Sequence, residues 1–273
     1  MSVYDLTGAE LELAWAQDGT APIDVYDLAG RRVGPGTAFY DVALLHALPN
    51  AFSFPGAKQG GCTDGTYIYQ TSGDFSTYWD LLKYRISDGE LTSRHYEAAD
   101  VDFGHCNDMA YDPIGKVLYI GTMRRDGSVI AVDPEDLSVL RTVYLKNGSG
   151  ESFAVWQFAF DRLSGHFLVA RDGVLLIYDR SWNYLREIPL PDKIDATAQG
   201  GETDGTYFYR LTYDPNGVEI IRLADGARVK VVSILVSGEP EAICYDWAGH
   251  WYMSRNLTEE IVHEIEMYEE EST

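Results

Sequence analysis

The chain has 273 residues, 45% of them hydrophobic, and a formal net charge of −22. This apolar content is enough for a packed core and excludes a disordered chain. The charge repels nucleic-acid backbones and anionic lipid, so we expect neither as a partner. No apolar run approaches the ~18 residues that span a bilayer, so we expect no membrane insertion.

The cysteines and the first residues indicate which bonding chemistry and which cellular location to expect. Cys62, Cys106 and Cys244 have no close spacing, so neither a disulfide framework nor a cysteine-rich zinc site is indicated. Residues 1–6 lack the basic and then apolar pattern of a secretory signal. We therefore expect a cytoplasmic or virion-associated protein.

Residues 1–36 carry a doubled motif of their own. Val-Tyr-Asp-Leu-Thr-Gly at residues 3–8 returns as Val-Tyr-Asp-Leu-Ala-Gly at residues 25–30, each followed by a strand-like segment. We interpret these as two β-hairpin-like modules that are too short to hold a core alone. They must pack on residues 37–273, on a partner, or on a copy of themselves. The segment is predicted to be a tether or an oligomer contact, joining a homo-oligomer or a virion or envelope partner.

Five copies of one pattern follow. Each copy has a polar or aromatic residue, a small-residue or apolar stretch, an Asp, a tight turn and an aromatic-rich strand, and successive Asp residues are 42 to 49 residues apart. A repeat of about 40–50 residues made of short strands is typical of a β-propeller blade. The copies begin at residues 59, 107, 156, 199 and 241. We therefore predict an all-β fold in which residues 37–273 form a five-bladed antiparallel β-propeller.

The fifth copy is short of a strand. After residues 251–255 it offers only 261–267 before an acidic tail, which leaves the last blade with three strands. An open sheet edge invites aggregation, so another segment must cover it. The apolar segment just before the first copy is the best donor. We predict that residues 38–48 pair with residues 261–267 and close the ring.

The position five residues before each repeat Asp begins an innermost strand, and in propellers this end of the strand opens around the central channel. The residues there are Gln59, Asn107, Trp156, Gln199 and Glu241. Polar groups with an aromatic wall suit a small polar ligand such as a sugar. The alternative is that these groups bond to one another and to ordered water around the axis. The sequence leaves both interpretations open.

The repeat Asp residues themselves lie at the opposite ends of the inner strands. They stand in turns such as Thr63-Asp64-Gly65 and Thr203-Asp204-Gly205. Asp in such a turn accepts hydrogen bonds from the turn backbone. We therefore interpret them as structural.

A polar cluster precedes the second innermost strand. His105, Asn107 and Asp108 stand together, and Glu202 and Glu241 could lie beside them. Such oxygens could bind Ca²⁺, His105 could bind a transition metal, and the set could supply a general acid and base. No metal-ligand motif of fixed spacing is present. We favour a polar network that pins the loops, and leave Ca²⁺ open as a cofactor.

Three segments of the sequence, residues 59–69, 104–113 and 239–241, resemble a poorly characterised family of bacterial and bacteriophage propellers. In that family a Gly-His-Ala-Asn-Asp-Met-type segment leads into the second blade, and here Cys106 replaces the Ala. The resemblance covers roughly residues 57–255 and implies the fold but no activity. The strand starts at Asn107-Asp108 and Pro240-Glu241 are also similar to those of calcium-dependent propeller lactonases. The doubled motif at the start of the chain resembles tether modules of phage and gut-bacterial proteins.

From these observations we expect a non-enzymatic recognition module that binds a glycan or another small polar ligand at the channel mouth. The setting would be a bacteriophage, a prophage or a cell envelope. The expected ligand-binding residues are Gln59, His105, Asn107, Asp108, Trp156, Gln199, Glu202 and Glu241. One alternative is a metal-dependent hydrolase of the lactonase or esterase kind, using His105, Asp108 and Glu241. Another is a scaffold with a water-filled channel.

Overall fold

The computed structural model describes residues 3–4, 10–11, 41–47, 57–73, 79–96, 103–171, 173–191, 197–234, 238–256 and 262–268. The chain divides into two compact units, Met1–Pro35 and Gly36–Thr273. In the first unit β1 (Val3–Tyr4) pairs antiparallel with β2 (Glu10–Leu11). Every element in the described part of the chain is a strand.

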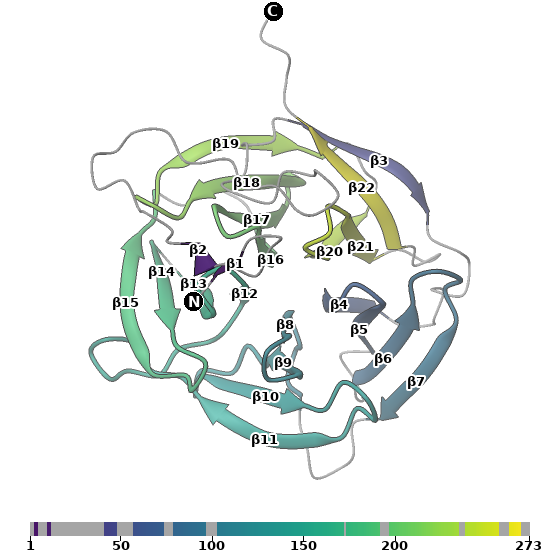
Figure 1. Ribbon diagram of the computed structural model, residues 1–273, viewed down its shortest axis with the longest axis horizontal. Helices are drawn as coiled ribbons and strands as arrows, with labels where there is room; N and C mark the ends of the chain where they lie inside the picture. The colour runs from purple at the N-terminus through teal and green to yellow at the C-terminus, as the bar shows by residue number, and fades with distance from the viewer. Residues whose placement is uncertain are drawn as a thin grey trace, which may run out of the picture. The chain divides into compact units, whose positions relative to one another are not determined.

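The second unit is a five-bladed β-propeller, made of five four-stranded antiparallel sheets in a ring (Figure 1). Blade 1 contains β4 (Ala57–Thr63), β5 (Tyr67–Gly73), β6 (Trp79–Arg85) and β7 (Leu91–Tyr96). Blade 2 contains β8 (Asp108–Asp112), β9 (Val117–Gly121), β10 (Ser128–Val132) and β11 (Val139–Tyr144). Blade 3 contains β12 (Gln157–Asp161), β13 (His166–Arg171), β14 (Val174–Tyr178) and β15 (Tyr184–Pro189). Blade 4 contains β16 (Thr197–Thr203), β17 (Tyr207–Tyr213), β18 (Gly217–Arg222) and β19 (Arg228–Ser233). Blade 5 contains β20 (Glu239–Tyr245), β21 (Trp251–Asn256), β22 (Val262–Tyr268) and β3 (Asp41–Ala47).

Blade 5 joins the two ends of this unit. Strand β3 pairs antiparallel with β22, from Ala47 opposite His263 to Asp41 opposite Tyr268. The predicted closure of the ring by residues 38–48 is therefore confirmed. Because the first and last strands share one sheet, the ring has no unpaired gap between its first and last blades.

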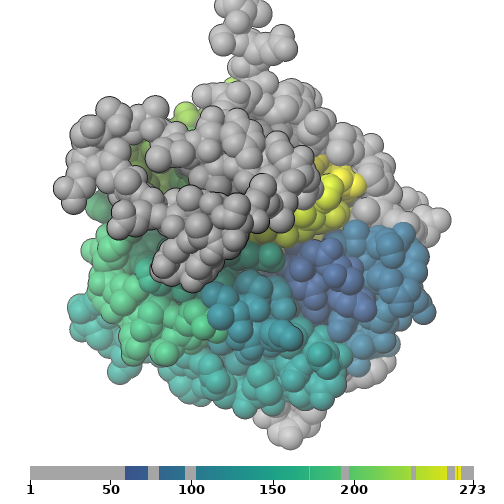
Figure 2. All heavy atoms as spheres, in the orientation of Figure 1, coloured from purple at the N-terminus to yellow at the C-terminus, as the bar shows by residue number. Residues whose placement is uncertain are grey.

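Large aromatic side chains fill the space between neighbouring blades, which appear in Figure 2 as adjoining coloured sectors. Between blades 2 and 3, the rings of Phe167 and Trp182 stack with their centroids 3.9 Å apart. Tyr119 of blade 2 meets both of them edge-on, at 4.9 and 5.1 Å. Phe158 is also fully buried in this cluster. Such pairs add directional contacts to the burial of apolar surface, and so fix how each blade leans on the next.

The innermost strands β4, β8, β12, β16 and β20 contact one another around the axis. Equivalent positions meet across blades: for example, the Gly60 N–H donates to the Cys106 carbonyl at 2.8 Å. The inner strands therefore run in one direction. We call the end where they begin the start mouth, and the end where they finish the turn mouth.

Asp side chains define the turn mouth. Asp64 Oδ1 accepts hydrogen bonds from the N–H groups of Thr66 and Tyr67 at 2.8 and 2.7 Å. Gly65 between them has φ +92°, a conformation that favours glycine. Asp204 repeats the arrangement with Thr206 and Tyr207, both at 2.8 Å. These bonds confirm the predicted structural role of the repeat Asp residues.

Candidate functional site

The five aligned residues lie where predicted along the chain. Gln59, Gln199 and Glu241 lie within β4, β16 and β20, while Asn107 and Trp156 directly precede β8 and β12. All but Trp156 are at most 3% exposed, and Trp156 is 40% exposed. The start mouth thus combines buried polar side chains with one accessible indole.

These residues bond across blade boundaries. Gln59 Nε2 donates to Glu241 Oε1 at 3.3 Å and links blades 1 and 5. Gln199 Nε2 donates to Glu239 Oε1 at 2.5 Å and links blades 4 and 5. Asn107 Nδ2 donates to the Trp156 carbonyl at 2.8 Å and links blades 2 and 3. The contacts are those expected of a polar network around the axis, and they hold these side chains in fixed orientations.

Three buried oxygens at this mouth have no hydrogen-bond partner in the described part of the chain: Gln59 Oε1, Glu241 Oε2 and Ser254 Oγ. Ser254 lies in β21 opposite Ala242, the neighbour of Glu241. A buried polar atom without a partner costs about 1–3 kcal/mol, so a native structure seldom keeps several together without a use. Ser254 was not predicted, because its place here depends on the pairing of β20 with β21.

Glu241 has unusual electrostatics. Burial raises its pKa to about 9, the charge of Glu239 adds to the rise, and the nearby side-chain amide of Asn256 opposes it. The side chain is 0% exposed, so the desolvation is complete. At neutral pH Glu241 is therefore an uncharged acid that can both donate and accept a hydrogen bond.

Asp108 lies deeper, among the inner strands. Its Oδ2 accepts the N–H groups of Phe158 in blade 3 and Gly201 in blade 4, both at 2.8 Å. Its Oδ1 accepts the N–H of Met109 at 2.9 Å. The side chain is 0% exposed. Burial raises the pKa of Asp108, and the three N–H donors oppose the rise. The Asp108 side chain therefore links blade 2 to blades 3 and 4 through hydrogen bonds. Its role in ligand binding remains a prediction.

His105 and Glu202 occupy different surroundings. His105 is partly exposed, its N–H donates to the Thr122 carbonyl at 3.1 Å, and burial lowers the pKa of its ring. Glu202 lies further along β16 than Gln199, towards the turn mouth. Its Oε1 accepts the Thr203 N–H at 2.9 Å and its Oε2 accepts the Tyr245 N–H at 3.2 Å. The structure therefore separates Glu202 from the start mouth.

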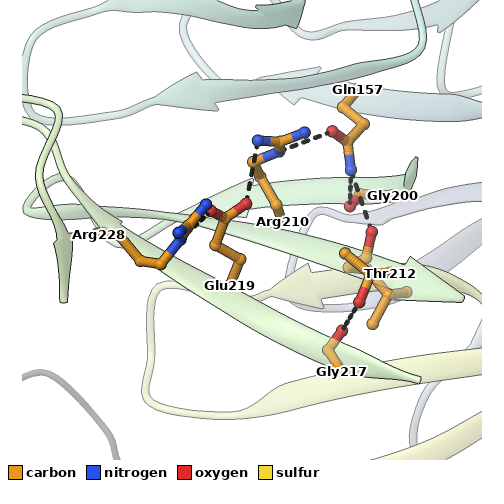
Figure 3. Close-up of polar contacts among 8 residues, drawn as sticks. Gln157, Gly200, Arg210, Thr212, Gly217, Glu219 and Arg228 are labelled. Atoms are coloured by element: carbon orange, nitrogen blue, oxygen red, sulfur yellow. Dashed lines mark hydrogen bonds and ion pairs between the residues drawn. The ribbon is translucent and has the colours of Figure 1, made fainter. Parts of the chain in front are cut away.

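A buried network that joins blade 3 to blade 4 supports the start mouth (Figure 3). Gln157 Nε2 donates to the Gly200 carbonyl at 3.1 Å, and Gln157 Oε1 accepts Arg210 Nε at 3.2 Å. Arg210 pairs with Glu219 at 3.0 Å, and Glu219 pairs with Arg228 at 2.5 Å. The network fixes the backbone next to Gln199. Arg210 and Glu219 stand directly opposite each other in β17 and β18, a match that a strand alignment of the sequence could have found.

Within the residues that the structure describes, no group of three or more His, Cys, Asp or Glu side chains is arranged to hold a metal ion. The same residues contain no helix long and apolar enough to cross a bilayer.

Comparison with known proteins gives the fold. No protein-family model matches the sequence, and no curated protein sequence matches it. Among solved structures, the chain is similar to a glutaminyl cyclase of Myxococcus xanthus, with a TM-score of 0.63, 13% identity, and coverage of 83% of this chain and 96% of that one. It is also similar to the PQQ-bound aldose sugar dehydrogenase of Streptomyces coelicolor, with a TM-score of 0.52, 10% identity, and coverage of 83% and 98%. At these identities the likeness concerns the fold alone.

Proposed function

We propose that the start mouth binds a small, uncharged polar ligand, such as a sugar, and that the propeller acts as a recognition module. One observation carries this proposal. Gln59 Oε1 and Glu241 Oε2 are buried at the mouth of the channel, and neither has a partner among the described residues. Hydroxyl groups of a ligand would satisfy both oxygens and remove the cost of leaving them unpaired.

The electrostatics of the mouth favour a neutral ligand. Glu241 is protonated at neutral pH, so Gln59, Gln199 and Glu241 present donors and acceptors without adding charge, while the carboxylate of Glu239 opposes an anion. The net charge of −22 repels anions at longer range. Trp156, with 40% of its surface exposed, offers an aromatic face for the apolar side of a sugar ring. The sequence resemblance to bacterial and bacteriophage propellers makes cell-envelope glycans the first class to test.

The second candidate is a hydrolase. The observation that favours it is the raised pKa of Glu241, which suits a general acid at neutral pH. In this alternative a metal ion, with Ca²⁺ as the first choice, would lie near His105 and Asp108. Metal analysis of the purified protein and ester or lactone hydrolysis, with and without added Ca²⁺ and Zn²⁺, test it.

The test of the recognition proposal is binding of the full chain to an array of neutral oligosaccharides, followed by titration calorimetry with each hit. We expect Trp156→Ala to weaken binding at least about tenfold by removing the stacking face, and Gln59→Leu to weaken it by removing one acceptor. Tyr144→Ala is the matched control, because Tyr144 is 61% exposed on the outer strand β11. An array without hits, or binding that both start-mouth variants leave unchanged, overturns the proposal.

A further inference from the structure

The turn mouth holds an arginine that reaches across the ring. Arg162 follows the turn residue Asp161 at the end of β12 in blade 3. Its guanidinium carbon lies 5.6 Å from the centroid of the Trp247 ring, which belongs to the turn after β20 in blade 5. Blades 3 and 5 are not neighbours, because blade 4 lies between them (Figure 1). The side chain therefore extends over the channel.

Among the described residues, this guanidinium has no hydrogen-bond acceptor. Arg162 is partly exposed, and burial lowers its pKa. Within the described part of the chain, its side chain makes no hydrogen bond and no ion pair. Its guanidinium makes a cation–π contact with the Trp247 ring. Its N–H donors have a fork geometry that matches a carboxylate. An arginine that is partly desolvated and unpaired is a ready binding group for an oxyanion.

Two phenol groups are close enough for the charge of Arg162 to act on them. The positive charge of Arg162 opposes the rise in pKa that burial causes in both Tyr111 and Tyr245. Neither hydroxyl has a hydrogen-bond partner among the described residues. The rings of Tyr245 and Trp247 lie 5.5 Å apart at 44°, so they present an aromatic wall next to the cation. The four side chains come from blades 2, 3 and 5.

Carboxylates complete the surroundings. Glu202, Asp64 and Asp246 are close enough for their charges to act on Arg162. Each is held by backbone N–H groups: Glu202 by Thr203 and Tyr245, Asp64 by its own turn, and Asp246 by Ala248 at 2.7 Å. A simple anion would be attracted by Arg162 and repelled by Asp64, Asp246 and the ionised fraction of Glu202. A ligand that carries both signs would match the mouth better.

We propose that the turn mouth is a second binding site, distinct from the start mouth, for a small zwitterion whose carboxylate pairs with Arg162 while its ammonium faces Glu202. An α-amino acid with an aromatic side chain is the simplest member of this class. Its carboxylate would accept the two parallel N–H bonds of the guanidinium, and its ring would lie against Tyr245 and Trp247.

Three probes of nearly equal size and shape test the charge requirement. Phenylalanine carries both charges, 3-phenylpropionate only the negative one, and 2-phenylethylamine only the positive one. Titration calorimetry on the full chain should show saturable binding of phenylalanine and at least about tenfold weaker binding of the other two. No saturable binding of phenylalanine overturns the proposal. Equal binding of 3-phenylpropionate overturns the zwitterion requirement.

Variants locate the site. Arg162→Gln should weaken phenylalanine binding at least about tenfold, whereas Arg125→Gln, at an exposed arginine of blade 2, should leave it unchanged. Arg162→Lys keeps the charge but loses the fork, so intermediate weakening is expected and covers the case in which the Gln variant does not fold. Trp156→Ala should not affect phenylalanine, which separates this site from the start mouth. Binding that Arg162→Gln and Arg162→Lys both leave intact contradicts the assignment.

Discussion

The two mouths of the channel are built from the same five strands but carry opposite chemistry. The start mouth holds amides and a protonated acid, Gln59, Gln199 and Glu241, which bond in pairs across blades. The turn mouth holds a cation, Arg162, that makes no ion pair in the described part of the chain and lies among carboxylates held by backbone N–H groups. At the turns, the repeated Asp side chains accept hydrogen bonds from their own turn backbone. The groups available to a ligand there therefore belong to residues that differ between copies. In this propeller the repeated Asp residues stabilise the turns, and the proposed turn-mouth site rests on residues that differ between copies.

Opening the ring should abolish both mouths together. A chain that begins at Ala51 lacks β3 and leaves β22 as an exposed edge, so we expect it to be insoluble. A chain that begins at Pro35 keeps β3 and should remain soluble with an unchanged circular dichroism spectrum. A soluble, folded chain beginning at Ala51 would contradict the role of β3 in closure.

A second pair of chain lengths tests residues 1–36, which we propose form a tether or an oligomer contact. Light scattering should give a larger particle for the full chain than for a chain that begins at Thr37. Equal masses and equal stability would show that the segment makes no assembly contact. Loss of ligand binding by the shorter, folded chain would show that the segment contributes to a site.

Asp108 lies between the two mouths and should matter to both. Asp108→Ala leaves the buried N–H groups of Phe158 and Gly201 without an acceptor, so we expect a loss of about 3–5 kcal/mol in the free energy of unfolding. Urea denaturation measures it. Asp126→Ala, in an exposed turn, is the control and should cost under about 1 kcal/mol. A stable Asp108→Ala protein would show that this carboxylate is not the anchor between blades.

The mouths should also titrate in different pH windows. Burial raises the pKa of Glu202 from 4.5 to about 7 and that of Glu241 from 4.5 to about 9. A raised carboxyl pKa stabilises the fold below the unfolded value, and this contribution is lost as pH rises through the folded value. The free energy of unfolding should therefore fall from pH 4.5 to 9, by up to about 1.4 kcal/mol per pH unit for each titrating group. Above pH 7 the contribution of Glu202 declines, whereas that of Glu241 continues to about pH 9.

Glu241→Gln isolates that window. The variant keeps a neutral side chain at every pH, so we expect its unfolding free energy to be flatter than that of the parent chain between pH 7 and 9. Urea denaturation at pH 5, 7 and 9 gives the comparison. Glu135→Gln, at an exposed residue, should follow the parent chain. The same slope in Glu241→Gln and the parent would mean that Glu241 is already ionised at neutral pH.

The smallest expected change in stability is that of Arg162→Gln, and Arg210→Gln provides the comparison. Arg210 is buried and paired with Glu219, so Arg210→Gln should cost about 3 kcal/mol. Arg162 has no ion pair in the described part of the chain, so Arg162→Gln should change stability by less than about 1 kcal/mol. Denaturant unfolding of both variants decides. A large loss at Arg162 would show that it is a structural residue, and would weaken the case for a ligand at the turn mouth.

The sequence predicted the repeated features of the fold. It did not predict the contacts that Asp108 and Arg162 make with other blades. The blade number and the pairing of β3 with β22 could be predicted, because repeat spacing and a missing strand are visible along the chain. The alignment of Gln59 with Glu241 could be predicted for the same reason. The donors to Asp108 are backbone groups of two other blades, which no side-chain pattern reveals. Arg162 near Trp247 depends on the diameter of the ring, and residue order does not encode that distance.

The closing strand has a consequence for synthesis on the ribosome. The partner of Ala47 is His263, roughly 200 residues later, so β3 leaves the ribosome long before β22 exists. Until then its backbone N–H and C=O groups form an open edge that another nascent chain could pair with. The four other blades are each built from consecutive strands and can form as they emerge. Completion of the propeller is therefore a late event. Chains released before β22 is made would differ from complete ones in having an unpaired β3.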